Sequence, residues 1–211
     1  AVLPLRTSIP APGGISLYMP SFLRGQQALA CKVVAVFRDN PRRHHLPTTT
    51  GTILLQDAET GRVCCIMDGE HLTAMRTGAA SGVATRWLAR RESGQTAGIF
   101  GAGVQARMQL QAVAEVRRLS RAWVYEPAAE AAAAFARDMS GRLDLEVLAS
   151  SSPAETARAD ILCTATTSSR PVFAGDRLSG WLSRPQPVVS DTQARGRNAP
   201  ECTFLPRSSA A

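Results

Sequence analysis

With 211 residues, of which 45% are hydrophobic, the chain is long enough for one ordinary domain, or one and a fraction, and it can bury a core. Its formal net charge of +7 comes from scattered arginines without interleaved aromatic residues, so we predict no nucleic-acid-binding surface. No apolar run approaches the roughly 20 residues that cross a bilayer, so we also predict no membrane-spanning helix.

The N-terminal part of the chain predicts a small, mostly antiparallel sheet. Pro10, Pro12 and the glycines at 13 and 14 mark a turn between two extended pieces. The turn residues "AETG" then separate two apolar runs, which is typical of a hairpin. The predicted strands are residues 15–20, 28–37, 51–57 and 62–68.

Residues 70–90 predict a helix with Asp68 as its N-cap. Its apolar residues approximate helical spacing, and they are Leu72, Met75, Ala79, Val83 and Leu88. Gly78 and Gly82 make the middle of this helix thin, although each costs about 1 kcal/mol of helix propensity relative to alanine. Two interpretations stay open: a ligand or another backbone approaches closely, or the helix packs tightly on its neighbour.

From residue 95 onward, strand and helix patterns alternate. This order predicts a parallel, doubly wound sheet. The predicted strands are 96–100, 122–126, 145–148 and 160–166, and the predicted helices are 104–117, 130–139 and 152–159. In the first of these helices, Val104, Met108, Leu110 and Val113 are expected near one side.

After Phe173 the periodicity is lost, and several prolines interrupt the sequence. We interpret this stretch as a poorly ordered tail or an incomplete domain. The predicted fold class is therefore α/β, with an incomplete Rossmann-type parallel sheet and a small, mostly antiparallel N-terminal domain. The predicted boundaries are 1–92 for a substrate and dimerisation domain, 93–175 for a dinucleotide-binding domain and 176–211 for an irregular tail.

The clearest motif is the glycine-rich sequence Gly101-Ala102-Gly103-Val104-Gln105-Ala106, which follows a predicted strand and opens a predicted helix. In a G-x-G-x-x-A pattern the first glycine permits the tight turn, the second lets a pyrophosphate approach, and the alanine keeps the helix close to the sheet. The free N–H groups at the helix start favour phosphate. We therefore predict a bound dinucleotide, with a simple glycine turn as the alternative.

The cofactor choice depends on Glu126, which ends the next predicted strand. An acidic side chain there can accept hydrogen bonds from the adenosine ribose and would repel a 2′-phosphate. NAD is therefore favoured over NADP, although Arg107 could hold a 2′-phosphate.

The five cysteines form no CxxC pair, and the three histidines show no ligand spacing, so no metal site is predicted. An odd cysteine count without a signal peptide favours a reducing, cytoplasmic location.

The sequence "LPTTTGTILLQDAETGRVCCIMDGEHLTAMRTGAASGVATRWLAR", followed by "GIFGAGVQARMQLQAV", strongly resembles the ornithine cyclodeaminase / mu-crystallin family. The resemblance covers roughly residues 1–175. It implies an NAD(P)-binding Rossmann domain and a second domain that binds substrate and forms a homodimer. It also implies hydride transfer between nicotinamide and the α-carbon of an amino or imino acid, as in ornithine cyclodeaminases and ketimine reductases.

The resemblance implies roles for individual residues. Arg6, Lys32 and Arg76 match the residues that hold the substrate carboxylate, and Lys32 could also donate or relay a proton. Without the resemblance, Lys32, which is the only lysine of the chain, could be a snorkelling residue at a sheet edge. The residues that match the family's cofactor contacts are Thr48, Arg76, Gly101, Gly103, Val104, Gln105, Ala106, Glu126, Thr164 and Thr166.

The end of the sequence departs from the family pattern. Asp191 follows Trp181-Leu182 and partly matches the aspartate that takes the amine proton in cyclodeaminases, but the spacing is short and the preceding glycines are absent. A solvated tail aspartate is the alternative. The family's opening helices and most of its C-terminal part are not matched, so a non-catalytic NAD(P)H-binding protein and an inactive truncated product are further alternatives.

Overall fold

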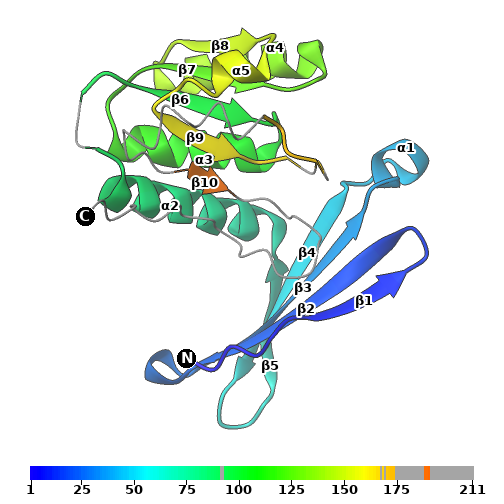
Figure 1. Ribbon diagram of the computed structural model, residues 1–211. Helices are drawn as coiled ribbons and strands as arrows, with labels where there is room; N and C mark the ends of the chain where they lie inside the picture. Colours follow the sequence, from blue (N-terminus) through cyan, green and yellow to red (C-terminus); the bar gives the residue numbers. More distant parts are fainter. Residues whose placement is uncertain (91–92, 167, 169, 174–187, 191–211) are drawn as a thin grey trace, which may run out of the picture. The chain divides into compact units, whose positions relative to one another are not determined.

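The computed structural model describes residues 1–90, 93–166, 168, 170–173 and 188–190 (Figure 1). The chain divides into two compact units, Ala1–Thr73 and Ala74–Ala211. The first unit contains β1 (Thr7–Ala11), β2 (Gly14–Leu23), β3 (Ala28–Phe37), α1 (Asn40–His44), β4 (Thr49–Asp57) and β5 (Val63–Asp68). A short 3₁₀ turn, Arg24–Gln26, separates β2 from β3.

Helix α2 (Glu70–Leu88) begins in the first unit and continues in the second. The second unit then contains β6 (Gln95–Phe100), α3 (Val104–Val116), β7 (Leu119–Tyr125), α4 (Ala129–Leu143), β8 (Val147–Ser150), α5 (Pro153–Thr156), β9 (Ile161–Thr164) and β10 (Val188–Ser190). The predicted α/β class with two sheets is confirmed.

The first unit is an antiparallel meander in the order β1-β2-β3-β4-β5, so β3 is its central strand. The predicted hairpin lies between β4 and β5. Its "AETG" turn is held by the Asp57 carboxylate, whose Oδ1 accepts hydrogen bonds from the backbone and hydroxyl of Thr60, each at 2.7 Å. Gly61 closes the turn at a φ of +71°, which side chains rarely adopt. These two positions explain why the "DAETG" sequence makes a tight turn.

The second unit is a parallel sheet in the order β10-β9-β6-β7-β8. This matches the Rossmann order, with the reversal between β6 and β9. Strand β10 lies within the stretch 176–211, for which an irregular tail is expected from the sequence, and its three residues are regular. Val188 pairs with Leu162 of β9. This contact is non-local and the strand is only three residues long in a proline-containing stretch, so the local sequence does not predict it.

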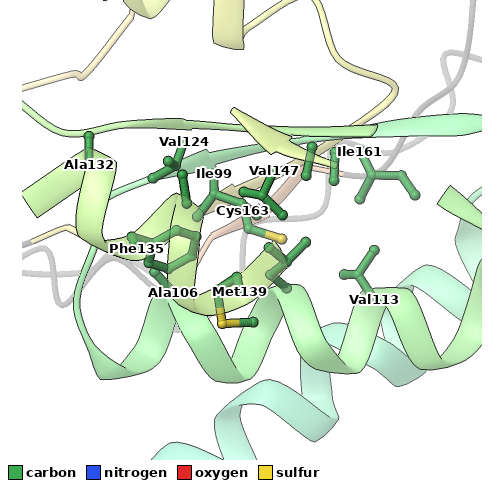
Figure 2. Close-up of a cluster of buried hydrophobic side chains, with 14 of the residues drawn as sticks. Ile99, Ala106, Val113, Val124, Ala132, Phe135, Met139, Val147, Ile161 and Cys163 are labelled. Atoms are coloured by element: carbon green, nitrogen blue, oxygen red, sulfur yellow. The ribbon is translucent and has the colours of Figure 1, made fainter. Parts of the chain in front are cut away.

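Alternate residues of β6 and β9 face two hydrophobic clusters. Ile99 and Cys163 lie in a cluster with residues of α3 and α4, such as Leu110 and Phe135 (Figure 2). Phe100 and Leu162 lie in a second cluster with Ala157, which follows α5. The parallel sheet is therefore covered on both faces. This explains why its central strands are almost continuously hydrophobic.

The Asp68 carboxylate accepts a hydrogen bond of 2.6 Å from the N–H of Glu70, the first residue of α2. It does so from one position before the N-cap, because the carbonyl of Gly69 accepts the first helical hydrogen bond, from Thr73. The buried face differs from the predicted one. Leu72, Val83 and Leu88 are exposed, whereas the small residues are buried: Ala74, Thr77, Gly78, Ser81, Gly82, Ala84 and Thr85. In α3, likewise, Val104 is exposed and Leu110 and Val113 are buried.

The two glycines of α2 account for this inversion. A Cβ on Gly78 would lie 2.5 Å from the carbonyl oxygen of Met108, and one on Gly82 would lie 3.0 Å from that of Ala112. The backbones of α2 and α3 therefore touch, which settles the open question for these glycines in favour of tight packing. Both glycines and α3 belong to the second compact unit, and the domain bounds 1–92, 93–175 and 176–211 stay predictions.

The guanidinium of Arg117, just after α3, caps the other end of α2. It donates hydrogen bonds to the carbonyls of Thr85 at 2.8 Å and Ala89 at 3.0 Å. Both carbonyls lie in or just after the last turn of α2, and that of Thr85 also accepts a hydrogen bond of 3.0 Å from the N–H of Ala89. Helix α2 is thus fixed to α3 along its middle and at its C-terminal end.

Replacing Gly78 with alanine is expected to destabilise the protein, although alanine is the better helix former. The new Cβ would overlap the Met108 carbonyl, and overpacking of this kind costs about 1–3 kcal/mol. Gly141 of α4 is the matched control, because a Cβ there meets nothing within 4 Å. Gly141→Ala should raise the free energy of unfolding by up to about 1 kcal/mol. Urea denaturation of both variants checks the opposite signs; stabilisation by Gly78→Ala would contradict the α2–α3 contact.

Candidate functional site

The glycine-rich loop lies where the strand order of the second unit reverses. Strand β6 ends at Phe100, and this residue pairs with Thr164 of β9 on one side and with Tyr125 of β7 on the other. The loop starts at the next residue. In open α/β sheets, ligands bind outside the carboxyl ends of the strands at such a reversal.

Gly101 is fixed between both neighbouring strands. Its N–H donates a hydrogen bond of 2.9 Å to the carbonyl of Tyr125. Its φ is +99°, and an added Cβ would lie 2.4 Å from the carbonyl oxygen of Ala165. Only glycine satisfies both conditions, so the tight turn expected from the sequence is present.

Gly103 is different, because nothing lies within 4 Å of an added Cβ. It is the N-cap of α3 in an extended conformation, and no side chain caps this helix. Ala106 is fully buried against the sheet, and Oε1 of Gln105 is buried without a hydrogen-bond partner among the described residues. An open approach over Gly103 and first-turn N–H groups without a side-chain cap fit a dinucleotide pyrophosphate.

Glu126 directly follows β7 and is half-buried. Because Gly101 is hydrogen-bonded to Tyr125, the acidic residue and the glycine loop begin at adjacent strand ends. This is where an adenosine ribose is expected from the sequence.

On the other side of the loop, Thr164 is the buried last residue of β9. The N–H of Ala165 donates a hydrogen bond of 2.8 Å to the carbonyl of Phe100, which continues the pairing past the strand. The Thr166 hydroxyl accepts a hydrogen bond of 3.1 Å from the N–H of Ser168. The structure therefore brings Gly101, Glu126 and Thr164 to one edge of the parallel sheet.

In the first unit, Lys32 lies on the central strand and not at a sheet edge. The antiparallel register places it opposite Met19 of β2 and Ile53 of β4. Directly opposed residues share a face, and the next residue of β3 on this face, Val34, is buried at 4% exposure. The ammonium of Lys32 therefore belongs to the more apolar face of the sheet, and the edge alternative does not apply.

Arg6 immediately precedes β1, whose Thr7 pairs with Tyr18. Arg6 itself is not a strand residue; it lies one position before this pair, and the next rung beyond the pair holds Met19 and Lys32. A common contact of Arg6 and Lys32 with a substrate carboxylate stays a prediction.

Thr48 lies at another position of the same sheet. Its carbonyl accepts a hydrogen bond of 2.8 Å from the N–H of Phe37, at the end of β3. Phe37 is five residues from Lys32, which corresponds to about 16 Å along a strand. The structure therefore separates Thr48 from the Lys32 rung.

Arg76 is an exposed residue of α2 in the second unit. Its place in a common pocket with Arg6 and Lys32 stays a prediction. Asp191 lies outside the described residues. Within the described ranges, no three His, Cys, Asp or Glu side chains are grouped so that they could hold a metal ion. No helix in the part of the chain that the structure covers has the length and apolar character to cross a membrane.

Residues 8–181 match the sequence pattern of the ornithine cyclodeaminase/mu-crystallin family. The chain belongs to this family. A Delta(1)-pyrroline-2-carboxylate reductase of Bacillus cereus is 37% identical over 175 residues, which are 82% of this chain and 53% of the reductase.

Two solved structures of related proteins share the fold. The Delta(1)-pyrroline-2-carboxylate reductase of Thermococcus litoralis, in complex with NADH and L-proline, is 47% identical, with a TM-score of 0.79 over 83% of this chain and 55% of that one. An archaeal alanine dehydrogenase dimer with bound NAD is 30% identical, with a TM-score of 0.77 over 83% of this chain and 53% of that one. The chain thus spans about half the length of the relatives it matches.

Within this family fold, sequence reasoning missed the surroundings of Arg107. The Nε of Arg107 donates a hydrogen bond of 2.8 Å to Asp138 of α4, and its Nη1 donates to the carbonyls of Ala102 and Gly103. The sequence analysis had considered this arginine only for a 2′-phosphate. The partner is 31 residues away, so no local pattern could reveal it.

Proposed function

We propose that this chain binds NAD(P)H and takes part in hydride transfer to the α-carbon of a small cyclic imino acid, in the manner of a pyrroline-2-carboxylate reductase. The observation that carries the proposal is the glycine loop at the reversal between β6 and β9, with Glu126 at the adjacent strand end. The similarity to two pyrroline-2-carboxylate reductases favours reduction over cyclodeamination.

In the proposed reaction, the C=N carbon of the imino acid accepts a hydride and its nitrogen accepts a proton, while NAD(P)H is oxidised. When bound, the nicotinamide supplies the hydride. Arg6 and Arg76 hold the substrate carboxylate, because a guanidinium binds a carboxylate through two parallel hydrogen bonds. Lys32 donates the proton to the imine nitrogen, and its apolar neighbours Met19 and Ile53 limit competing water.

For the cofactor, we propose that Gly101, Gly103 and the start of α3 hold the pyrophosphate, and that Glu126 holds the adenosine ribose. Glu126 favours NADH, because its carboxylate would repel a 2′-phosphate. We further propose a homodimer, as in the structure of the archaeal alanine dehydrogenase. Thr48, Thr164, Thr166 and Asp191 stay predictions from the family resemblance.

Fluorescence titration with NADH and NADPH tests the proposal first. Binding, followed by oxidation of NADH when Delta(1)-pyrroline-2-carboxylate is added, is the expected result. Formation of proline from L-ornithine without this reductase activity would instead indicate a cyclodeaminase.

A second candidate is a protein that binds NAD(P)H without turnover. It is suggested by the match to a family that also includes the mu-crystallins. NADH binding with neither reaction is its signature. If neither cofactor binds, both proposals are wrong.

A further inference from the structure

Arg107 lies in the first turn of α3, four residues after Gly103. Its Nη1 donates hydrogen bonds to the carbonyl of Ala102 and, at 3.3 Å, to that of Gly103. Its Nε donates at 2.8 Å to Oδ2 of Asp138, and its guanidinium carbon lies 5.0 Å from the ring centre of Phe135. One side chain therefore connects two carbonyls of the glycine loop with two residues of α4.

Asp138 is itself held in place. Its other oxygen, Oδ1, accepts a hydrogen bond of 2.7 Å from Nε of Arg142, one turn further along α4. The hydrogen bond from Arg107 is the main cause that lowers the pKa of the Asp138 carboxyl, and the Arg142 hydrogen bond and charge add to it. The carboxylate therefore stays ionised at neutral pH, and it fixes one edge of the Arg107 guanidinium.

Peptide geometry converts these contacts into an effect on the loop. In a trans peptide the C=O and the N–H point in opposite directions. The carbonyl of Ala102 shares its peptide with the N–H of Gly103, and the carbonyl of Gly103 shares its peptide with the N–H of Val104. When Arg107 holds both carbonyls on its own side, both N–H groups must point to the opposite side.

We propose that Arg107 is a positioning residue for cofactor binding, which aims the N–H groups of Gly103 and Val104 at the dinucleotide pyrophosphate. This inference rests on the proposed function. Glycine at 103 has wide conformational freedom. The backbone N–H of Arg107 already holds its carbonyl at 3.3 Å, and the guanidinium adds a second restraint that also reaches the Ala102 carbonyl, which precedes the helix. The guanidinium also offsets the partial negative charge of two carbonyls close to the phosphates.

The Arg107–Asp138 pair also links the glycine loop to the segment that contains Glu126. Helix α4 begins at Ala129, three residues after Glu126, and Asp138 belongs to this helix. The contact from Arg107 to Asp138 therefore holds the helix behind the glycine loop against the helix behind the ribose-binding residue. This use of Arg107 differs from 2′-phosphate binding, because its Nε and Nη1 are committed to Asp138 and the loop.

The test uses Arg107→Met, which keeps much of the stem on Phe135 and removes the hydrogen-bond donors. Arg121→Met is the matched control. Arg121 also donates to a carboxylate, Glu146 at 2.6 Å, and lies 5.9 Å from the ring centre of Trp123, but it lies near the start of β7, whereas the glycine loop adjoins the end of this strand. Fluorescence titrations of each full-length variant give the Kd of NADH and of NADPH, and circular dichroism gives Tm.

We expect Arg107→Met to weaken the binding of NADH and of NADPH by a similar factor of about tenfold or more. The reason is that the charged guanidinium no longer donates hydrogen bonds to Asp138 and to the loop carbonyls, so the loop N–H groups are no longer held toward the phosphates. Arg121→Met should leave both affinities unchanged. Arg107→Lys should rescue little, because an ammonium lacks the planar fork that serves Asp138 and two carbonyls together. Asp138→Asn should weaken both cofactors less than Arg107→Met.

Competition with ADP-ribose and adenosine separates positioning from a general loss of structure. In Arg107→Met the affinity for ADP-ribose should fall, whereas that for adenosine, which has no pyrophosphate, should stay. The inference would be overturned by an equal loss of affinity for both competitors, by a loss of affinity for NADPH alone, or by an unchanged affinity for NADH. Failure of the wild-type chain to bind NADH would instead reject the proposed function, and this inference with it.

Discussion

Replacing Lys32 with methionine is expected to lower turnover of the imino acid by about 10²–10⁴-fold, the usual contribution of a positioned acid or base. Methionine fits between Met19 and Ile53 on the apolar face of the central strand, so folding should not suffer. The NADH affinity should stay nearly unchanged, because Lys32 belongs to the first compact unit and the glycine loop belongs to the second.

Lys32→Arg is the informative companion variant, because it keeps the positive charge but raises the pKa far above that of an ammonium. If Lys32 donates a proton, Lys32→Arg should be almost as slow as Lys32→Met. If it only anchors the carboxylate, Lys32→Arg should retain much of the activity. Steady-state kinetics, with Tm as a check on folding, distinguish these results. Full activity of Lys32→Met would show that the assignment of this side chain is wrong.

The two glycines of the loop should respond differently to the same small change. Gly103→Ala is expected to weaken NADH binding by at least about tenfold, because its methyl group occupies the approach that the pyrophosphate requires. The free energy of unfolding should change by no more than about 1 kcal/mol, since nothing in the protein lies within 4 Å of the new Cβ.

Gly101→Ala should instead lose both binding and stability. Its Cβ would lie 2.4 Å from the Ala165 carbonyl oxygen, at a φ of +99°, and strain with overpacking costs roughly 2–4 kcal/mol. Urea denaturation and NADH titration of both variants check the contrast. Normal NADH binding by a folded Gly103→Ala protein would contradict a pyrophosphate at this loop.

The sequence was sufficient where a function depends on neighbouring residues. The loop from Gly101 to Ala106 and the acidic residue Glu126 follow strands with clear apolar runs, and the parallel sheet brings their ends together. Strand β3 was also predicted with its observed bounds, because its apolar run is long and only Lys32 interrupts it.

The sequence was misleading where packing involves the backbone. Apolar periodicity selected Leu72, Val83 and Leu88 of α2 as the buried residues, yet these side chains are exposed. The helix buries its small residues, because Gly78 and Gly82 let the α3 backbone approach. A pattern based on hydrophobicity does not detect a glycine that is needed because its missing side chain leaves room for a neighbouring backbone.

Long-range partners were out of reach for a related reason. Strand β10 pairs in parallel with β9, and Arg107 meets Asp138 from another helix. Both contacts follow from the order of the strands and helices in space, which a local pattern does not specify. The role of Arg107 therefore emerged only from the structure.

The single lysine of the chain also makes the central strand of the first unit chemically addressable. In a protein of these 211 residues, reductive methylation with isotope-labelled formaldehyde would label Lys32 as the only lysine. The pH dependence of its NMR signal would report the protonation of that amine without any substitution. The residue proposed to deliver the proton is therefore also a built-in spectroscopic probe of its own ionisation, with and without a bound carboxylate.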